Sequence, residues 1–228
     1  MIILQYFTFS TTAELVCLIT ALLCLRKHSN AVWRSMIIFM LITYVTELMG
    51  FHLKMVNHAD PVHTHNNEWL YNLLLIVQIG FISLMFRTIL NKYTNSDPAI
   101  IAGIVVLAII YLYQVFNQTF YKYYNLTNII ASILFVLYGL VYYYLLLKDS
   151  AHENLIMSAS FWWVAGILFF YFGRTMCNIF FSQSPLIKID PKNNHNLAHY
   201  IYIVLNLILY SCWSYSFICQ RQTTRSNN

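Results

Sequence analysis

The sequence predicts an all-α integral membrane protein, a bundle of seven transmembrane helices with its N-terminus outside and its C-terminus in the cytoplasm. Of the 228 residues, 59% are hydrophobic and only 9% are charged, whereas soluble domains have about 25% charged residues. Apolar stretches long enough to cross a bilayer as helices recur along the whole chain. The connections between them are short and carry most of the lysines and arginines, as topology signals do.

The seven spans are expected at residues 3–25, 33–51, 69–90, 99–116, 126–147, 161–181 and 195–219. Polar connections separate them, among them a histidine-rich segment at 52–68 and a loop with two prolines at 182–194. Residues 1–219 therefore form one transmembrane domain, and residues 220–228 form a polar cytoplasmic tail. No internal repeat is visible, which disfavours a transporter built from duplicated halves.

The orientation follows from the distribution of basic residues between the two sides. One side of the predicted bundle holds Arg26, Lys27, Arg34, Arg87, Lys92, Lys148, Arg221 and Arg225. The other side holds Lys54, Lys122, Lys188 and Lys192. The richer side is expected to be cytoplasmic. Six of the eight histidines then belong to the outer side. The net charge of +5 is scattered in short connections and forms no basic run, which excludes a nucleic-acid partner.

Three ionisable side chains lie well inside the predicted spans: Glu14 in the first, Glu47 in the second and Arg174 in the sixth. Charged groups at this depth are costly and face protein or water. Glu47 and Arg174 lie at matched depth in spans that run in the same direction, so they are able to pair. Such a pair either fixes packing or belongs to a ligand or proton site. Glu14 is either neutral through burial or a second partner.

Polar and aromatic residues form a stripe at helical spacing in the seventh span. The stripe consists of His195, His199, Tyr202, Asn206, Tyr210 and Trp213. A weaker stripe in the third span includes Tyr71 and Gln78. Gly166 and Gly173 lie seven residues apart on one face of the sixth span and predict a close helix approach. Each stripe is either a packing seam or part of an outward-opening polar pocket.

His195 and His199 form an HxxxH pattern, whose spacing places two imidazoles on one helical face as a potential metal pair. His52 follows the second span on the same predicted side. This arrangement is similar to the seven-helix zinc hydrolases of the ceramidase and adiponectin-receptor kind. The resemblance implies zinc ligands at His52, His195 and His199. The aspartate that these enzymes carry early in the third span is absent here, and only Glu68 or Glu47 could substitute.

Three segments resemble a group of small, uncharacterised seven-helix membrane proteins common in Bacteroidota. These segments are residues 44–50, residues 66–72 and the aromatic, glycine-containing stretch 161–173. The resemblance implies a bacterial inner-membrane location and seven helices, and it implies no activity.

From these residues we expect a non-enzymatic sensory or accessory module in contact with the lipid bilayer. It has no cofactor, and its output requires a separate signalling or membrane partner protein because the cytoplasmic connections are short. The alternatives are a zinc-dependent membrane hydrolase acting on lipid amides and a small transporter or channel.

Overall fold

The structure, a computed structural model, describes residues 8–26, 30–59, 67–119, 121–149, 155–182, 188–190 and 195–226. The α-helices within these ranges are α1 (Phe9–Leu25), α2 (Ala31–Ala59), α3 (Glu68–Leu90), α4 (Asp97–Asn117), α5 (Asn125–Lys148), α6 (Ala159–Ser182) and α7 (Leu197–Ser226). A 3₁₀ turn, η3 (Leu155–Met157), precedes α6. A short antiparallel ribbon of β1 (Lys188–Asp190) and β2 (His195–Asn196) precedes α7. The chain divides within α5 into two compact units, unit 1 (Met1–Ala131) and unit 2 (Ser132–Asn228).

Six of these helices, α2 to α7, are long and apolar enough to cross a membrane. The chain is therefore an integral membrane protein. The helices expected at 69–90, 99–116, 126–147 and 161–181 are confirmed to within two residues at each end. The described part of the first expected span, α1, has only 17 residues. At 1.5 Å per residue it is about 25 Å long, less than the roughly 30 Å of a hydrocarbon core. Residues 3–7 of that span lie outside the described residues, so a seventh span stays a prediction.

The second helix is longer than the sequence suggested. We expected it to end at Phe51, before a polar connection, but α2 continues to Ala59. Histidine and lysine are polar without breaking a helix, and residues 52–59 contain neither glycine nor proline. The first strong helix breaker after His52 in the sequence is Pro61. In the same way, α7 continues to Ser226 and includes most of the predicted polar tail.

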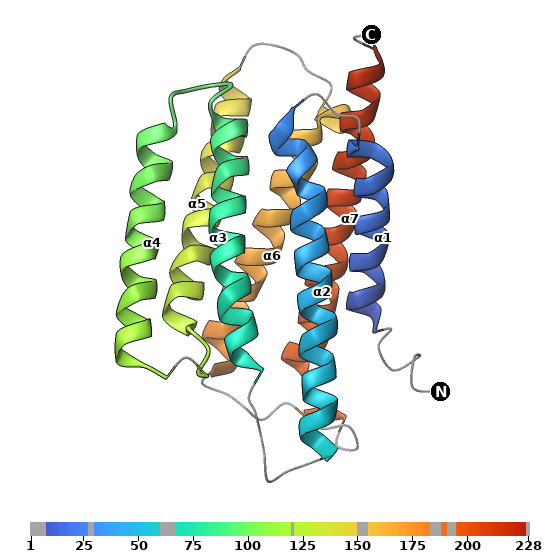
Figure 1. The fold of residues 1–228 in the computed structure, drawn as a ribbon. Coiled ribbons are helices and arrows are strands. Elements are labelled where there is room, and N and C mark those ends of the chain that lie inside the picture. The colour runs from blue at the N-terminus through green and yellow to red at the C-terminus, as the bar shows by residue number, and fades with distance from the viewer. Residues whose placement is uncertain are drawn as a thin grey trace. The chain divides into compact units, whose positions relative to one another are not determined.

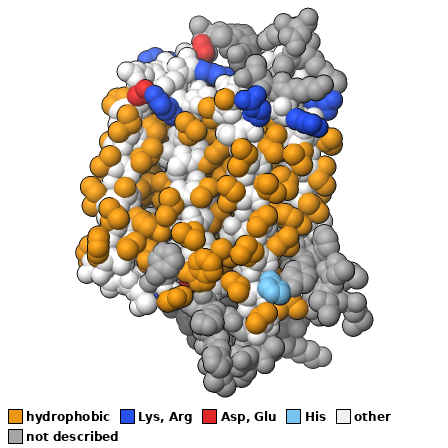
Figure 2. Space-filling view, viewed as in Figure 1, with side chains coloured by type: hydrophobic (Ala, Val, Ile, Leu, Met, Phe, Trp, Pro, Cys, Tyr) orange, Lys and Arg blue, Asp and Glu red, His pale blue; other side chains and the backbone are white. Residues whose placement is uncertain are grey.

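In unit 1, α1 packs against α2, α2 against α3 and α3 against α4 (Figure 1). Figure 2 shows hydrophobic side chains along these helices and Lys and Arg side chains gathered at the end where α3 meets α4. The α3–α4 connection is tight there because Arg87 forms a bidentate ion pair with Asp97, at 2.8 and 2.7 Å. The amide of Asn91 also donates to Asp97, at 2.6 Å.

A buried asparagine holds the connection between α4 and α5. Asn72, on α3, is fully buried. Its amide nitrogen donates to the backbone carbonyl of Lys122 at 3.0 Å, and its oxygen accepts from the backbone N–H of Tyr124 at 3.0 Å. The carboxylate of Glu68 accepts from the backbone N–H of Tyr123 at 2.7 Å. We call Asn72 and Glu68, together with Gln114, the amide clamp.

Gln114, on α4, completes the amide clamp at the start of α5. Its side-chain oxygen accepts from both the backbone N–H and the hydroxyl of Thr127, at 2.9 and 2.6 Å. Both side chains are buried. The clamp thus supplies hydrogen-bond partners to backbone and hydroxyl groups that lie outside the regular hydrogen bonding of a helix.

In unit 2, α6 packs along α7 over much of its length. Their surfaces meet through stacked indoles, with the rings of Trp163 and Trp213 parallel and 6.0 Å apart. The hydroxyl of Ser216 donates to the carbonyl of Ala159 at 2.7 Å. The hydroxyl of Tyr143, on α5, donates to the carbonyl of Phe161 at 3.1 Å. Carbonyls near the start of α6 thus accept bonds from both α5 and α7.

The amide clamp gives the first prediction. Asn72→Ala is expected to lower the free energy of unfolding by about 1–3 kcal/mol for each of the two backbone groups that lose their partner. Asn125→Ala, at an exposed asparagine of α5, is the matched control and should change stability little. Thermal unfolding of both variants in the same detergent micelles measures the difference. Equal melting temperatures would show that the clamp does not stabilise the protein.

Candidate functional site

Two acidic side chains of unit 1 share an environment with one tyrosine. The hydroxyl of Tyr71, on α3, donates to a carboxylate oxygen of Glu47, on α2, at 3.3 Å. Glu14, on α1, lies within electrostatic reach of the same tyrosine. The Glu14 side chain is only 2% exposed. We call Glu14, Glu47 and Tyr71 the carboxylate site.

Gly50 allows the tyrosine to lie against α2. A Cβ atom at this position would lie only 2.5 Å from the Tyr71 hydroxyl oxygen and 3.0 Å from the ring carbon that carries it. The amide of Asn67 donates to the carbonyl of Gly50 at 3.1 Å, which ties the chain just before α3 to the same turn of α2. The first turn of α3 therefore packs closely against the helix that carries Glu47. This close approach brings the phenol within reach of the carboxylate.

The remaining polar candidate of unit 1 lies further along α3. Gln78 is half-buried and follows Tyr71 by two helical turns, so both residues share a face of α3. Among the described residues, no hydrogen bond joins Gln78 to Glu14, Glu47 or Tyr71.

Arg174 lies half-buried on α6, with its guanidinium carbon 5.9 Å from the centre of the Phe170 ring. This distance permits a cation–π contact within one helix. Arg174 belongs to unit 2 and Glu47 to unit 1. The ion pair between them stays a prediction.

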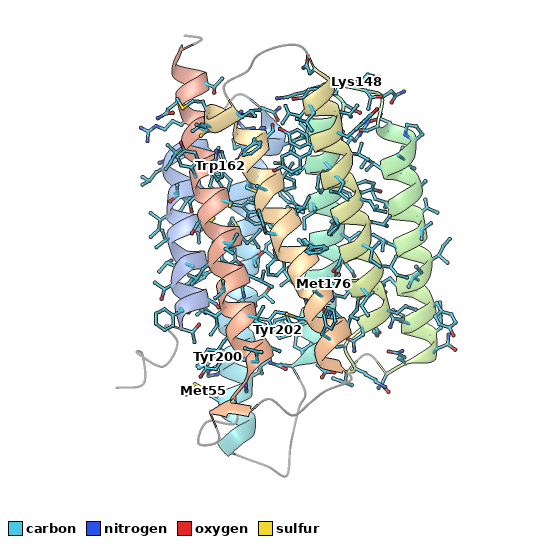
Figure 3. All side chains as sticks on the ribbon, turned by 180° about the vertical axis from the view of Figure 1, so that it is seen from behind. Met55, Lys148, Trp162, Met176, Tyr200 and Tyr202 are labelled. Atoms are coloured by element: carbon cyan, nitrogen blue, oxygen red, sulfur yellow. The ribbon has the colours of Figure 1, made fainter. Side chains whose placement is uncertain are left out.

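The polar stripe of the seventh span takes part in packing against α6. The hydroxyl of Tyr202 donates to Asn178 of α6 at 2.8 Å (Figure 3). Tyr210 is buried, with its ring edge-on to Trp213 at 6.1 Å. Asn206 is half-buried on the same helix.

The close helix approach expected at Gly166 and Gly173 is confirmed. A Cβ atom at Gly166 would lie 3.1 Å from the Cβ of Cys212 and 3.2 Å from the carbonyl oxygen of Leu209. At Gly173 it would lie 2.5 Å from the side chain of Leu205. These contacts, with those of Tyr202 and Trp213, give the stripe a packing role.

The predicted zinc ligands are placed only in part. The side chains of His52, on α2, and His199, on α7, are exposed. His195 lies in β2, ahead of α7, which begins at Leu197. The helical geometry expected for the HxxxH pair therefore does not apply, and the His195 side chain lies outside the described part of the chain. Within the described part, no three His, Cys, Asp or Glu side chains gather in a way that could hold a metal ion.

Sequence reasoning missed the amide clamp. Glu68 was considered a substitute for a catalytic acid, but its carboxylate accepts a backbone hydrogen bond from Tyr123. Asn72 and Gln114 carried a usable signal, because they are strongly polar side chains inside apolar spans. Their partners lie in the α4–α5 connection and could not be identified from spacing.

The chain matches none of the protein-family models, curated proteins or solved structures with which it was compared. The class of protein therefore rests on the helices themselves, which make it an integral membrane protein. The resemblances to the Bacteroidota group and to the zinc hydrolases remain expectations from the sequence.

The close approach at Gly50 gives a prediction for the carboxylate site. Gly50→Ala should destabilise the protein by about 1–3 kcal/mol, because the added methyl group overlaps the Tyr71 phenol. Tyr71→Phe removes the nearest atom of the overlap and also the hydrogen bond to Glu47. The double variant is expected to lose less stability than the sum of the two single losses. Additive losses in thermal unfolding would contradict this arrangement of α2 and α3.

A second prediction compares two glycines on different helix surfaces. Gly166→Ala should cost about 1–3 kcal/mol, because the new methyl group meets backbone and Cβ atoms of α7. A Cβ atom at Gly80, on α3, would meet no atom within 4 Å. Gly80→Ala should therefore raise stability by about 0.5–1 kcal/mol through the better helix propensity of alanine. Unfolding of both variants in one detergent tests the contrast, which a loss at both positions would contradict.

Proposed function

We propose that the protein is a seven-helix integral protein of a bacterial inner membrane that works as a non-enzymatic sensory or accessory module. Its ligand or partner binds at the carboxylate site. The observations that carry the proposal are the burial of Glu14, at 2% exposure, and the hydrogen bond from Tyr71 to Glu47. Ionisable side chains inside membrane spans are costly and serve mainly binding, transport or signalling.

The basic side chains of unit 1 support the proposed orientation. Arg26, Arg34 and Lys92 are exposed at the end of the unit where α1 and α3 finish and α2 begins. Lys54 and Lys122 are exposed at the opposite end. The richer end is the cytoplasmic one by the positive-inside rule. The N-terminus then lies outside, with α1 and the apolar residues ahead of it as the seventh span.

The chemistry of the carboxylate site selects the class of ligand. Glu14 and Glu47 contribute carboxylate oxygens, and Tyr71 contributes a phenol. A ligand that complements them carries a positive charge and N–H donors, as an organic amine does. Arg174 supplies the same chemistry from within the chain in the proposed ion pair with Glu47. The output of ligand binding would then pass to a separate partner protein.

Thermal-shift measurements on the purified protein in nanodiscs test this function. Primary and quaternary amines are the probes, with zinc as the competing candidate. A bound amine at about 100 times its Kd should stabilise the protein by about 2.7 kcal/mol. Glu14→Gln is expected to abolish this shift, whereas Asp97→Asn, which removes a carboxylate outside the site, should preserve it.

Two outcomes would contradict the proposal. Amines could stabilise Glu14→Gln as much as the unaltered protein, which would remove the carboxylate site as the binding site. Alternatively, zinc alone could stabilise the protein, with the shift lost on combining His195→Ala with His199→Ala. That result would favour the zinc hydrolase.

A further inference from the structure

The 3₁₀ turn η3 exposes three consecutive apolar side chains in unit 2. Leu155 is 42% exposed, Ile156 is 64% exposed and Met157 is 46% exposed. Exposure of apolar surface to water costs about 25 cal/mol for each Å². Three adjacent aliphatic side chains therefore need a partner that removes them from water.

Hydrogen bonds hold the backbone of this turn, so its exposed side chains are part of an ordered structure. The carbonyl of Ile156 accepts from the indole N–H of Trp162 at 2.9 Å and from the thiol of Cys219 at 3.7 Å. The backbone N–H of Ser158 donates to the carbonyl of Leu155 at 3.2 Å. With its backbone bonded inward to α6 and α7, the turn directs its side chains outward.

The surroundings of the turn have the composition of a membrane interface. The rings of Trp162 and Tyr215 meet edge-to-face at 5.0 Å, and Trp and Tyr concentrate at the level of lipid headgroups. Ile218, next to Cys219 on α7, is 40% exposed. The apolar surface of the turn thus belongs to the unit whose helices already face lipid.

Basic side chains accompany this apolar surface. Lys148 ends α5, and Figure 3 shows it at the same end of unit 2 as Trp162. Arg221 is exposed at the same end of α7 as Cys219, whose thiol bonds to the turn. Cations next to aromatic and aliphatic groups complement the phosphates and acyl chains of a bilayer surface.

We propose that η3 is an interfacial anchor, which inserts Leu155, Ile156 and Met157 into the boundary between headgroups and acyl chains. Its partner is the lipid bilayer. The anchor fixes the depth of the start of α6 in the membrane, because the indole of Trp162 bonds to the same turn. This role is independent of any ligand at the carboxylate site.

Photo-crosslinking in nanodiscs tests the anchor. The photoreactive residue p-benzoylphenylalanine replaces Ile156, and the nanodiscs contain phosphatidylcholine and phosphatidylglycerol. Leu140, 53% exposed on α5, provides the lipid-facing control, and the exposed Asn95 in the α3–α4 connection provides the water-facing control. Intact mass after irradiation should show the addition of one phospholipid at position 156, as at position 140, and none at position 95.

Either of two results would overturn the anchor. Absence of a lipid adduct at position 156, with an adduct at position 140, would mean that the turn faces water. A crosslink from position 156 to a second copy of the chain would mean that the turn is a protein interface. Size-exclusion chromatography before irradiation confirms that each labelled protein is folded, which keeps a negative result interpretable.

Discussion

A bilayer offers no water to polar groups, so every amide and carbonyl inside it must find its partner within the protein. Helices meet this demand internally, and the demand is most severe where a helix ends. Unit 1 meets it between α4 and α5 with the side chains of Asn72 and Gln114, which bond the connection from two neighbouring helices. Unit 2 meets it at the start of α6, where Tyr143 and Ser216 donate to backbone carbonyls. These hydrogen bonds fix the ends of the helices to neighbouring helices. They thereby position the side chains that lie between the helices.

Most of the helices were predictable, because an apolar stretch of the right length has one stable structure in a membrane. The prediction was wrong where polar residues were expected to end a helix. His52 is polar, but it does not interrupt the hydrogen bonding of a helix, and α2 passes through it to Ala59. The opposite error occurred at His195, which the HxxxH spacing placed on a helix and which lies in β2. A residue pattern indicates a face only if the backbone is helical throughout the pattern.

The polar contacts were less predictable, because they depend on which residues the packing brings together. The depth of Glu47 suggested a buried charge, but nothing in its spacing indicated that Tyr71 would donate to it. That contact requires the absence of a side chain at Gly50. The same residue type gives three different results along the chain. Gly50 admits a phenol, Gly166 admits a neighbouring helix, and Gly80 faces open space. From sequence spacing alone, a close helix approach was predictable only at Gly166 and Gly173.

The residue types at the two polar clusters of unit 1 suggest different roles. The amide clamp depends mainly on Asn72 and Gln114, whose amides carry no charge and match one donor or acceptor to each backbone group. Its one carboxylate, Glu68, lies in the first turn of α3, where the helix dipole favours a negative charge. Glu14 and Glu47 lie within their helices, away from the helix N-terminus, and an amide at position 47 would accept the Tyr71 hydrogen bond at a lower desolvation cost. A carboxylate at each of these two positions is explained if its negative charge serves the function of the protein. Binding of a cation is such a function.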